Sequence, residues 1–334
     1  MMRRRYFITG VGALVVLPAA VVAQQASKLH RVALILTTSP ISEMAGVDPV
    51  HPGTRAFLQE LRALGYTEGQ NIVVERRSAE GHFDRFPSIA RELVTLKTDV
   101  IVVAGGNSHY KQVKDTTSSV PIVMLASQEP EKAGLVASLA RPGGNVTGFT
   151  IDISPEIDAK RLELLREAIT GLRRVAYIGS KAAWDSAGAQ ALRRAASTFG
   201  VELTHVESTP TDYTTAFATI ERQRPDAVFA SFSPETFANR QALAEFTLKA
   251  RLAGMFPYAE IAEAGGLMSY GMSVPDLFRR SAHYVDKLLK GARPADLPIE
   301  RPTKFDLVIN RRTANQLGLS IPQSVLLRAE RVIE

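Results

Sequence analysis

Short β-branched runs alternate with segments of helical period along most of this chain. Residues 31–36 have the composition of a buried strand, and residues 54–64 place four large apolar side chains on one helical face before Gly65 ends the helix. Strands that alternate with helices of about ten residues predict βαβ units and a mainly parallel sheet covered by helices on both faces. Further strands are expected at residues 72–75, 100–104 and 122–125, and further helices at residues 88–96, near residue 112 and at residues 134–140.

The same pattern then begins again. Three pairs of segments correspond in order along the chain: residues 31–35 with 174–178, 65–73 with 199–203, and 98–103 with 225–230. These correspondences predict two similar α/β lobes rather than one large sheet. A chain of 334 residues is long enough for two lobes of roughly 150 residues, each with its own core.

The expected fold class is therefore α/β, with two Rossmann-like lobes that contain parallel sheets and are joined by a hinge. The first lobe is expected to comprise residues 29–146 and about 268–292, and the second residues 147–267 and about 293–334. The sequence leaves open which lobe holds the C-terminal strand, expected at residues 305–310, and the helix after it.

Two Gly-rich segments mark the places where the chain is expected to change direction. Residues 141–148, Arg-Pro-Gly-Gly-Asn-Val-Thr-Gly, form either an interlobe hinge or an ordinary turn. Residues 265–271 are expected to form a second such change of direction. The next segment, residues 275–290, has a continuous apolar side and ends at Gly291, which predicts a long amphipathic helix.

The N-terminus has the pattern of an export signal. Three arginines, Arg3 to Arg5, precede an apolar stretch of roughly 15 residues that ends near Ala23. Two glycines and a proline interrupt this stretch, whereas a membrane anchor needs ~20 uninterrupted apolar residues. Residues 1–23 are therefore expected to be a signal peptide, with an uncleaved transmembrane helix as the alternative. The arginines also resemble a twin-arginine signal, so the export route stays open between two pathways into the periplasm.

Composition and motifs exclude several classes of chemistry. The formal net charge of +6 is spread along the chain with no Lys/Arg run typical of a nucleic-acid partner. The chain has no cysteine, and its six histidines lack metal-ligand spacing, so no metal and no cofactor are expected. No G-x-S-x-G elbow or P-loop occurs, and Gly105-Gly106-Asn107 is too short for a dinucleotide loop. These absences predict binding without catalysis, and an exported hydrolase is the disfavoured alternative.

Polar residues follow the expected strands, where open parallel sheets bind their ligands. Helix N-termini that follow such loops offer free N–H groups, which predicts a small ligand that is at least partly anionic or zwitterionic. Ordinary helix capping explains each serine equally well. Trp184 either stacks on the ligand or packs against its own lobe, and Tyr258 either contacts the ligand or closes the core. The candidate ligand-binding residues are Thr38, Ser39, Gly106, Asn107, Ser127, Gln128, Ser180, Trp184, Ser233, Tyr258 and Glu260.

Four motifs carry a resemblance to a known family. Residues 61–72, 134–148, 265–271 and 307–310 resemble the uncharacterised ABC-transporter substrate-binding family that includes tryptophan- and tyrosine-binding transport proteins. The resemblance runs from about residue 31 to the C-terminus. It implies a type I periplasmic binding protein fold, with a small ligand held between two lobes joined by crossing strands.

The cleft loops depart from that family. Residues 128–130 read Gln-Glu-Pro where many relatives have Gly-Asp-Pro, and residues 179–181 read Gly-Ser-Lys where a Trp-Asn-Pro type of loop is common. These differences leave the identity of the ligand open.

The resemblance implies an exported, monomeric receptor that captures an amino acid or a similar small carboxylate and delivers it to ABC permease subunits. The alternative is an extracytoplasmic sensor subunit that passes ligand binding to a membrane kinase or a chemoreceptor.

Overall fold

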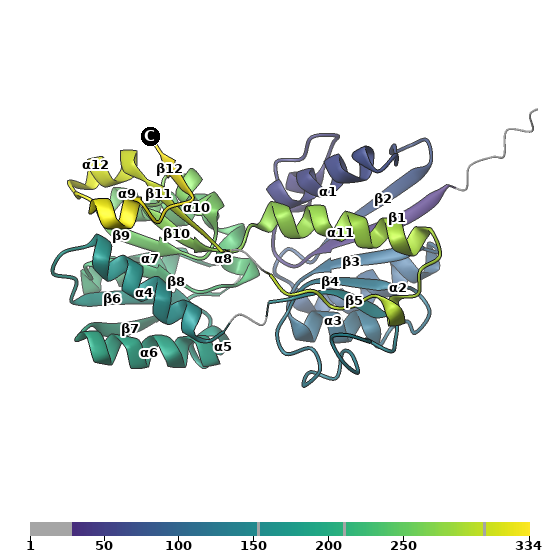
Figure 1. Cartoon of the computed structure of the whole chain (residues 1–334), viewed down its shortest axis with the longest axis horizontal. Coiled ribbons are helices and arrows are strands. Elements are labelled where there is room, and N and C mark those ends of the chain that lie inside the picture. Colours follow the sequence, from purple (N-terminus) through teal and green to yellow (C-terminus); the bar gives the residue numbers. More distant parts are fainter. Residues whose placement is uncertain (1–28, 152–153, 210–211, 303–304) are drawn as a thin grey trace, which may run out of the picture.

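The computed structural model describes residues 29–151, 154–209, 212–302 and 305–334, which form two α/β lobes side by side (Figure 1). The expected signal peptide, residues 1–23, lies outside the described residues. Among the residues that are described, no helix is both long enough and apolar enough to span a bilayer.

The first lobe is built on a five-stranded parallel sheet in the order β2-β1-β3-β4-β5. Its strands are β1 His30–Leu36, β2 Ile72–Ser78, β3 Val100–Ala104, β4 Ile122–Ser127 and β5 Val146–Thr150. Its helices include α1 Pro52–Ala63, α2 Phe86–Thr95 and α3 Asn107–Lys114, together with the 3-10 turns Ile41–Met44 and Phe83–Arg85.

The second lobe holds a seven-stranded sheet in the order β12-β11-β10-β9-β8-β6-β7. Its strands are β6 Arg174–Gly179, β7 Glu202–Glu207, β8 Ala227–Ala230, β9 Ala253–Phe256, β10 Met268–Gly271, β11 Asp306–Asn310 and β12 Arg331–Ile333. Its helices are α4 Glu156–Ala168, α5 Lys181–Trp184, α6 Ala187–Phe199, α7 Thr214–Gln223, α8 Pro234–Ala238, α9 Arg240–Lys249, α10 Ala259–Glu263, α12 Arg311–Leu317 and α13 Gln323–Leu326.

The two sheets repeat one topology. Starting from its β7 edge, the second sheet runs β7-β6-β8-β9-β10, which reproduces the order β2-β1-β3-β4-β5 of the first. The prediction of two similar lobes is confirmed. The C-terminal strands extend only the second sheet, since β11 pairs antiparallel with β10 and β12 pairs parallel with β11.

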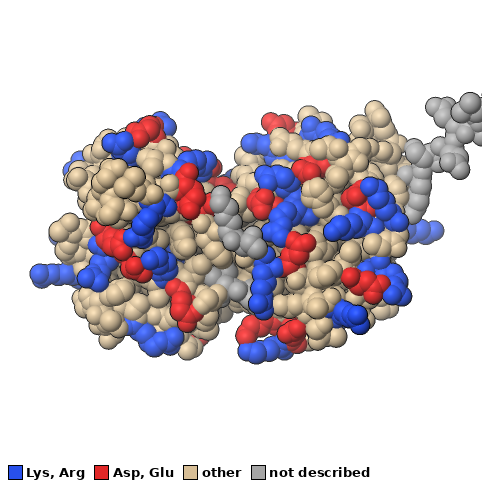
Figure 2. All heavy atoms as spheres, viewed as in Figure 1, with Lys and Arg blue, Asp and Glu red and all other residues tan. Residues whose placement is uncertain are grey.

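Each sheet is buried on both faces, as parallel sheets require. Strand β1 shows this directly: Val32 and Leu34 belong to the core under α1 and α11, whereas Ala33 and Ile35 belong to the core under α2 and α3. Helix α11, Val274–Leu289, returns from the second sheet to pack along α1, so the predicted amphipathic helix is confirmed. Lys/Arg and Asp/Glu side chains are interspersed over both lobes on the face in Figure 2.

Several expected boundaries were wrong. Strand β5 pairs with β4, so residues 147–150 lie in the first sheet, and β10 lies in the second sheet although residues 268–271 were assigned to the first lobe. Residues 299–300 also run along the first lobe, because the N–H of Glu300 donates to Gly148 O and the N–H of Thr150 donates to Glu300 O.

The Gly-rich segment at residues 141–148 is therefore not the hinge. Gly148 has φ +120°, and a Cβ there would lie 2.2 Å from the carbonyl oxygen of Met124. Glycine is needed because two neighbouring strands approach closely inside the first lobe. The chain instead passes between the lobes after β5, between β10 and α11, and before β11.

Residues 134–140 do not form the expected helix. Gly134 has φ +67°, a left-handed conformation that ends any helical run. The carboxylate of Glu131 accepts the backbone N–H of Leu139, and the N–H of Ala137 donates to Pro142 O. These bonds satisfy the backbone in an irregular loop.

Candidate functional site

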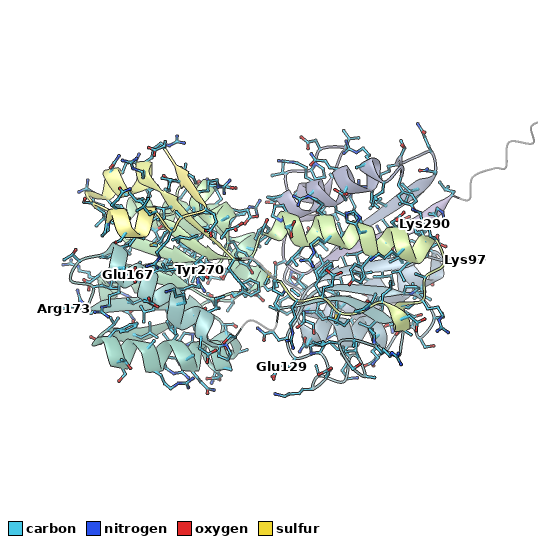
Figure 3. The ribbon with its side chains drawn as sticks, viewed as in Figure 1. Lys97, Glu129, Glu167, Arg173, Tyr270 and Lys290 are labelled. Carbon is cyan, nitrogen blue, oxygen red and sulfur yellow. The ribbon has the colours of Figure 1, made fainter. Side chains whose placement is uncertain are left out.

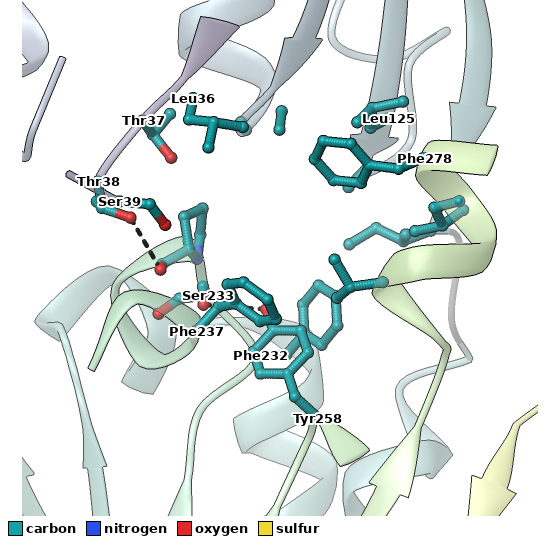
Figure 4. Close-up of a pocket in the computed structure, with 18 of the residues that line it drawn as sticks. Leu36, Thr37, Thr38, Ser39, Leu125, Phe232, Ser233, Phe237, Tyr258 and Phe278 are labelled. Atoms are coloured by element: carbon teal, nitrogen blue, oxygen red, sulfur yellow. Dashed lines mark hydrogen bonds between the residues drawn. The ribbon is translucent and has the colours of Figure 1, made fainter. Parts of the chain in front are cut away.

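A cavity of about 420 Å³ lies between the lobes, and we call it the apolar cavity (Figure 4). Its walls come from the loops after β1, β3 and β4, from the start of α3, and from α8 and α11. Of the described residues that line it, none is Asp, Glu, Lys or Arg. The cavity therefore offers apolar surface and neutral hydrogen-bonding groups.

One wall is polar and is held together by Asn107, the first residue of α3. Its Oδ1 accepts hydrogen bonds from the hydroxyl of Ser127 (2.8 Å) and from the N–H of Gln128 (3.1 Å), and its Nδ2 donates to Gln128 O. Asn107 thus ties the start of α3 to the loop after β4. Ser127 is fully buried and is occupied by this bond.

The opposite wall is aromatic. The ring of Tyr258 packs against Phe232 and Phe237 of the second lobe, at centroid distances of 5.0 and 5.2 Å, and its hydroxyl donates to Ser233 O (3.0 Å). Burial raises the pKa of Tyr258 well above its usual value, so the phenol stays neutral. Figure 4 shows these rings with Phe278 of α11 around the cavity.

Three contacts cross between the lobes beside the apolar cavity. The hydroxyl of Thr38 donates to Pro234 O (2.9 Å), and Arg240 Nη2 donates to Glu43 Oε2 (2.9 Å). The third contact is an edge-on packing of the His51 ring against Phe237, with centroids 5.2 Å apart. These contacts hold the loop after β1 and the start of α1 against α8 and α9.

A second cavity of about 680 Å³, which we call the charged cavity, shares part of its wall with the first. Glu129 of the first lobe and Tyr270 of the second lobe line it near the junction in Figure 3. Its most buried charge is Arg161, which is 1% exposed. Arg161 Nη1 donates to Asp158 Oδ1 (2.9 Å) and Nη2 donates to Ala230 O (2.8 Å). These bonds join α4 to the end of β8.

Most of the predicted ligand-binding residues line one of the two cavities. The apolar cavity is lined by Thr38, Ser39, Gly106, Asn107, Gln128, Ser233 and Tyr258. The charged cavity is lined by Gln128, Ser180 and Ser233. Ser180 also caps α5, because its hydroxyl accepts the N–H of Ala183 (3.2 Å). Contact of these residues with a ligand stays a prediction.

Trp184 lines neither cavity. Its indole stacks on His205 with centroids 4.9 Å apart and an interplanar angle of 2°, and the Arg193 guanidinium lies 4.4 Å above the ring. The chain forms helix α5 directly after Ser180, and this turn directs the indole onto its own lobe. The structure thus favours the packing alternative for Trp184.

Glu260 also lies outside both cavities. It is buried in α10, and its Oε2 has no hydrogen-bond partner in the described part of the chain. Burial raises the pKa of Glu260 to about 7. A buried carboxyl of this kind belongs to the lobe interior rather than to a ligand contact.

Helices bring to the apolar cavity several residues that the pattern of post-strand loops does not indicate. His51 precedes α1, Phe237 belongs to α8, and Leu277 and Phe278 belong to α11. The sequence pattern predicts the α11 residues only as part of the apolar face of a helix. Part of that face turns into the cavity because α11 crosses from the second lobe to the first.

Comparison with known proteins gives a family and a fold. A family model described as ABC transporter substrate binding protein matches residues 46–333. A curated relative, the tyrosine-binding protein of Clostridioides difficile (strain R20291), is 32% identical over 138 residues. This alignment spans 41% of the chain and only 39% of the relative's own length.

Two solved structures share the architecture over nearly the whole chain. A conserved domain protein from Vibrio cholerae O1 biovar eltor has a TM-score of 0.77 at 25% identity and covers 91% of this chain and 100% of its own. An ABC domain from Streptococcus pneumoniae in complex with L-Trp has a TM-score of 0.74 at 21% identity, with 92% and 100% covered. The expected type I periplasmic binding protein fold is confirmed.

Proposed function

The chain belongs to the family of ABC transporter substrate-binding proteins, and from this premise we propose that it captures a small ligand between its lobes and delivers it to an ABC importer. The observation that carries the proposal is the apolar cavity, because both lobes contribute to its walls. A volume of about 420 Å³ lies within the range of small-molecule sites. The proposed receptor acts as a monomer and makes or breaks no bond.

The proposed ligand is an amino acid or a similar small carboxylate with an aromatic or apolar body. The rings of Phe232, Phe237 and Tyr258 suit such a body. A carboxylate would find N–H groups at the start of the eight-residue helix α3, next to Gly105 and Gly106. The name of the C. difficile relative and the L-Trp complex of the S. pneumoniae structure make aromatic amino acids the first ligands to test.

Closure of the lobes would convert binding into a signal that the importer can read. The Thr38 to Pro234 bond and the Glu43 to Arg240 pair form only when the lobes meet. A ligand that contacts both walls of the apolar cavity adds to these contacts and shifts the population toward the closed state. The hinge is proposed to lie at the three places where the chain passes between the lobes.

The working compartment is proposed to be the periplasm, reached through cleavage of residues 1–23. N-terminal sequencing of the protein recovered from a periplasmic extract should then begin near Gln24. Full-length protein held tightly in the membrane would contradict this.

The binding proposal is tested on purified protein that begins at Gln24. L-Tyrosine, L-tryptophan, L-phenylalanine and benzoate are compared with L-lysine and glycine by thermal unfolding and calorimetry. A ligand at 100 times its Kd should stabilise the fold by about 2.7 kcal/mol. Failure of every aromatic compound at millimolar concentration would reject the proposed ligand class.

Delivery is tested separately with candidate ABC permease and ATPase subunits from the same organism, reconstituted in vesicles. The liganded receptor should stimulate ATP hydrolysis more than the ligand-free receptor. Tight ligand binding without any stimulation would reject delivery and point to the sensor alternative.

A further inference from the structure

His51 precedes α1, and one of its ring nitrogens is occupied by a hydrogen bond that caps this helix. The N–H of Thr54 donates to His51 Nδ1 (3.0 Å), and the hydroxyl of Thr54 lies 3.1 Å from the same nitrogen. A ring nitrogen that accepts an N–H must present its lone pair. In a neutral imidazole the proton then sits on the other nitrogen, Nε2. Helix capping thereby fixes the tautomer of His51.

The surroundings of the ring keep it neutral. His51 is 2% exposed and packs between Phe237 of the second lobe and Phe278 of α11, at centroid distances of 5.2 and 5.5 Å. Gly53 allows this packing, because a Cβ there would lie 2.6 Å from the Phe278 ring. Burial, followed by the nearby charge of Arg240, lowers the pKa of His51 to about 3.

The proton on Nε2 has no partner in the described part of the chain. All hydrogen bonds of the His51 side chain use Nδ1, and Nε2 is not among the polar atoms that are sealed from water. His51 lines the apolar cavity and is otherwise buried, so this cavity is the space into which its Nε2–H can donate. An unpaired donor next to aromatic rings favours any occupant that brings an acceptor to it.

We infer that His51 is a specificity residue of the apolar cavity, whose Nε2–H donates to an oxygen on the ring end of the ligand. The cavity therefore selects an oxygen-bearing aromatic ring, such as a phenol, over a bare ring. His51 packs against the rings of Phe237 and Phe278, whereas the helix N–H groups suited to a carboxylate belong to a different lining element, α3. This inference rests on the proposed function only in taking this cavity as the ligand site.

The test compares two matched pairs of probes, L-tyrosine with L-phenylalanine and p-cresol with toluene. Calorimetry or NMR titration measures the affinity ratio within each pair for the wild type, His51→Asn and His51→Phe. Asn is a favourable N-cap whose oxygen can still accept the Thr54 N–H, but its side chain is too short to reproduce Nε2. His51→Asn thus removes the Nε2–H donor but keeps the helix cap. Thermal unfolding verifies that this variant folds.

We expect the wild type to favour the oxygen-bearing member of each pair by about tenfold. Both variants should bring the ratio close to one while affinity for the bare ring stays similar. A wild-type ratio near one, or a ratio that survives in folded His51→Asn, overturns the inference. So does an NMR spectrum that places the His51 proton on Nδ1.

The second pair separates this inference from the proposed function. If neither amino acid binds but p-cresol is preferred over toluene through His51, the proposed amino-acid ligand fails and the inference holds. If both amino acids bind with equal affinity in the wild type, the proposed function holds and the inference fails. A wild type that binds none of the four probes overturns both.

Discussion

The two cavities between the lobes share part of a wall and differ in whether a polar group without a hydrogen-bond partner is accessible from the cavity. The charged cavity holds Arg161, two of whose nitrogens donate to Asp158 and to Ala230 O, whereas its Nε is buried without a partner in the described part of the chain. The apolar cavity has no ionised lining residue but leaves His51 Nε2 open. What distinguishes a ligand site from a structural one here is an unpaired group that a ligand can reach, since the unpaired Arg161 Nε is sealed whereas His51 Nε2 is not. The residues common to both cavities are Gln128, Ile151, Phe232, Ser233 and Met272.

If the charges of the charged cavity are structural, removing Arg161 should damage the fold rather than binding alone. Arg161→Met keeps an apolar stem but leaves Asp158 and Ala230 O without their partner. We expect a loss of about 3–5 kcal/mol in the free energy of unfolding, measured by urea denaturation. The control is Lys160→Ala, which removes the exposed pair with Glu163 and should cost less than about 1 kcal/mol. A stable Arg161→Met protein that has lost its ligand would reverse our assignment of the two cavities.

A bulky side chain placed in each cavity should show directly which one takes the ligand. Ser108 is exposed at the apolar cavity, and Ala182 is exposed at the charged cavity. Ser108→Trp should weaken binding on the order of a hundredfold, or about 2.7 kcal/mol, because the indole occupies the ligand's space. Ala182→Trp is the matched control and should bind normally. Calorimetry that gives the opposite pattern would move the ligand to the charged cavity.

Glu260 provides a pH-dependent contrast, since it is a buried carboxyl outside both cavities. Its pKa is raised from 4.5 to about 7 by burial, so the folded state binds more protons than the unfolded state between these values. Stability should therefore fall as pH rises from about 4.5 to 7. Glu260→Gln removes this loss and should add about 2–3 kcal/mol at pH 7.5 but little at pH 4.5. Unfolding curves at both pH values test it, and an equal gain at both would show that the effect is not ionisation.

The ion pair between the lobes should contribute modestly to binding through closure. Arg240→Gln breaks the partly buried contact with Glu43, so the closed state loses about 1 kcal/mol and ligand affinity falls about fivefold. The control Arg279→Gln removes an exposed pair with Asp276 within α11 and should leave affinity unchanged. Unchanged affinity in Arg240→Gln would mean that this pair plays no part in closure.

The sequence predicted the repeated lobes because buried parallel strands leave a local signature, as residues 31–36 and 174–178 show. It located the polar wall of the apolar cavity for the same reason: strand ends are visible in sequence and parallel strands end at one edge. It could not locate His51, Phe237 or Phe278, because their place depends on how α8 and α11 dock. Nor could it foresee that residues 141–148 use glycine for close strand packing, which looks the same as a hinge in sequence.

The smallest expected effect is that of ligand binding on the fluorescence emission of Trp184. This emission distinguishes a movement of the lobes relative to each other from a change within the second lobe. The neighbours of its indole, His205, Arg193 and Tyr177, all belong to the second lobe. A rigid movement of the lobes would leave these contacts intact. Ligand addition should therefore leave the position of the Trp184 emission unchanged, while urea unfolding should shift it. Because Trp184 is the chain's only tryptophan, steady-state fluorescence measures it alone. Ser108→Trp is unsuitable as a control here, because its added indole would also fluoresce. The control is Ser108→Phe, which blocks the apolar cavity without adding a second indole. A shift in the wild type that is absent in Ser108→Phe would show that closure remodels the second lobe.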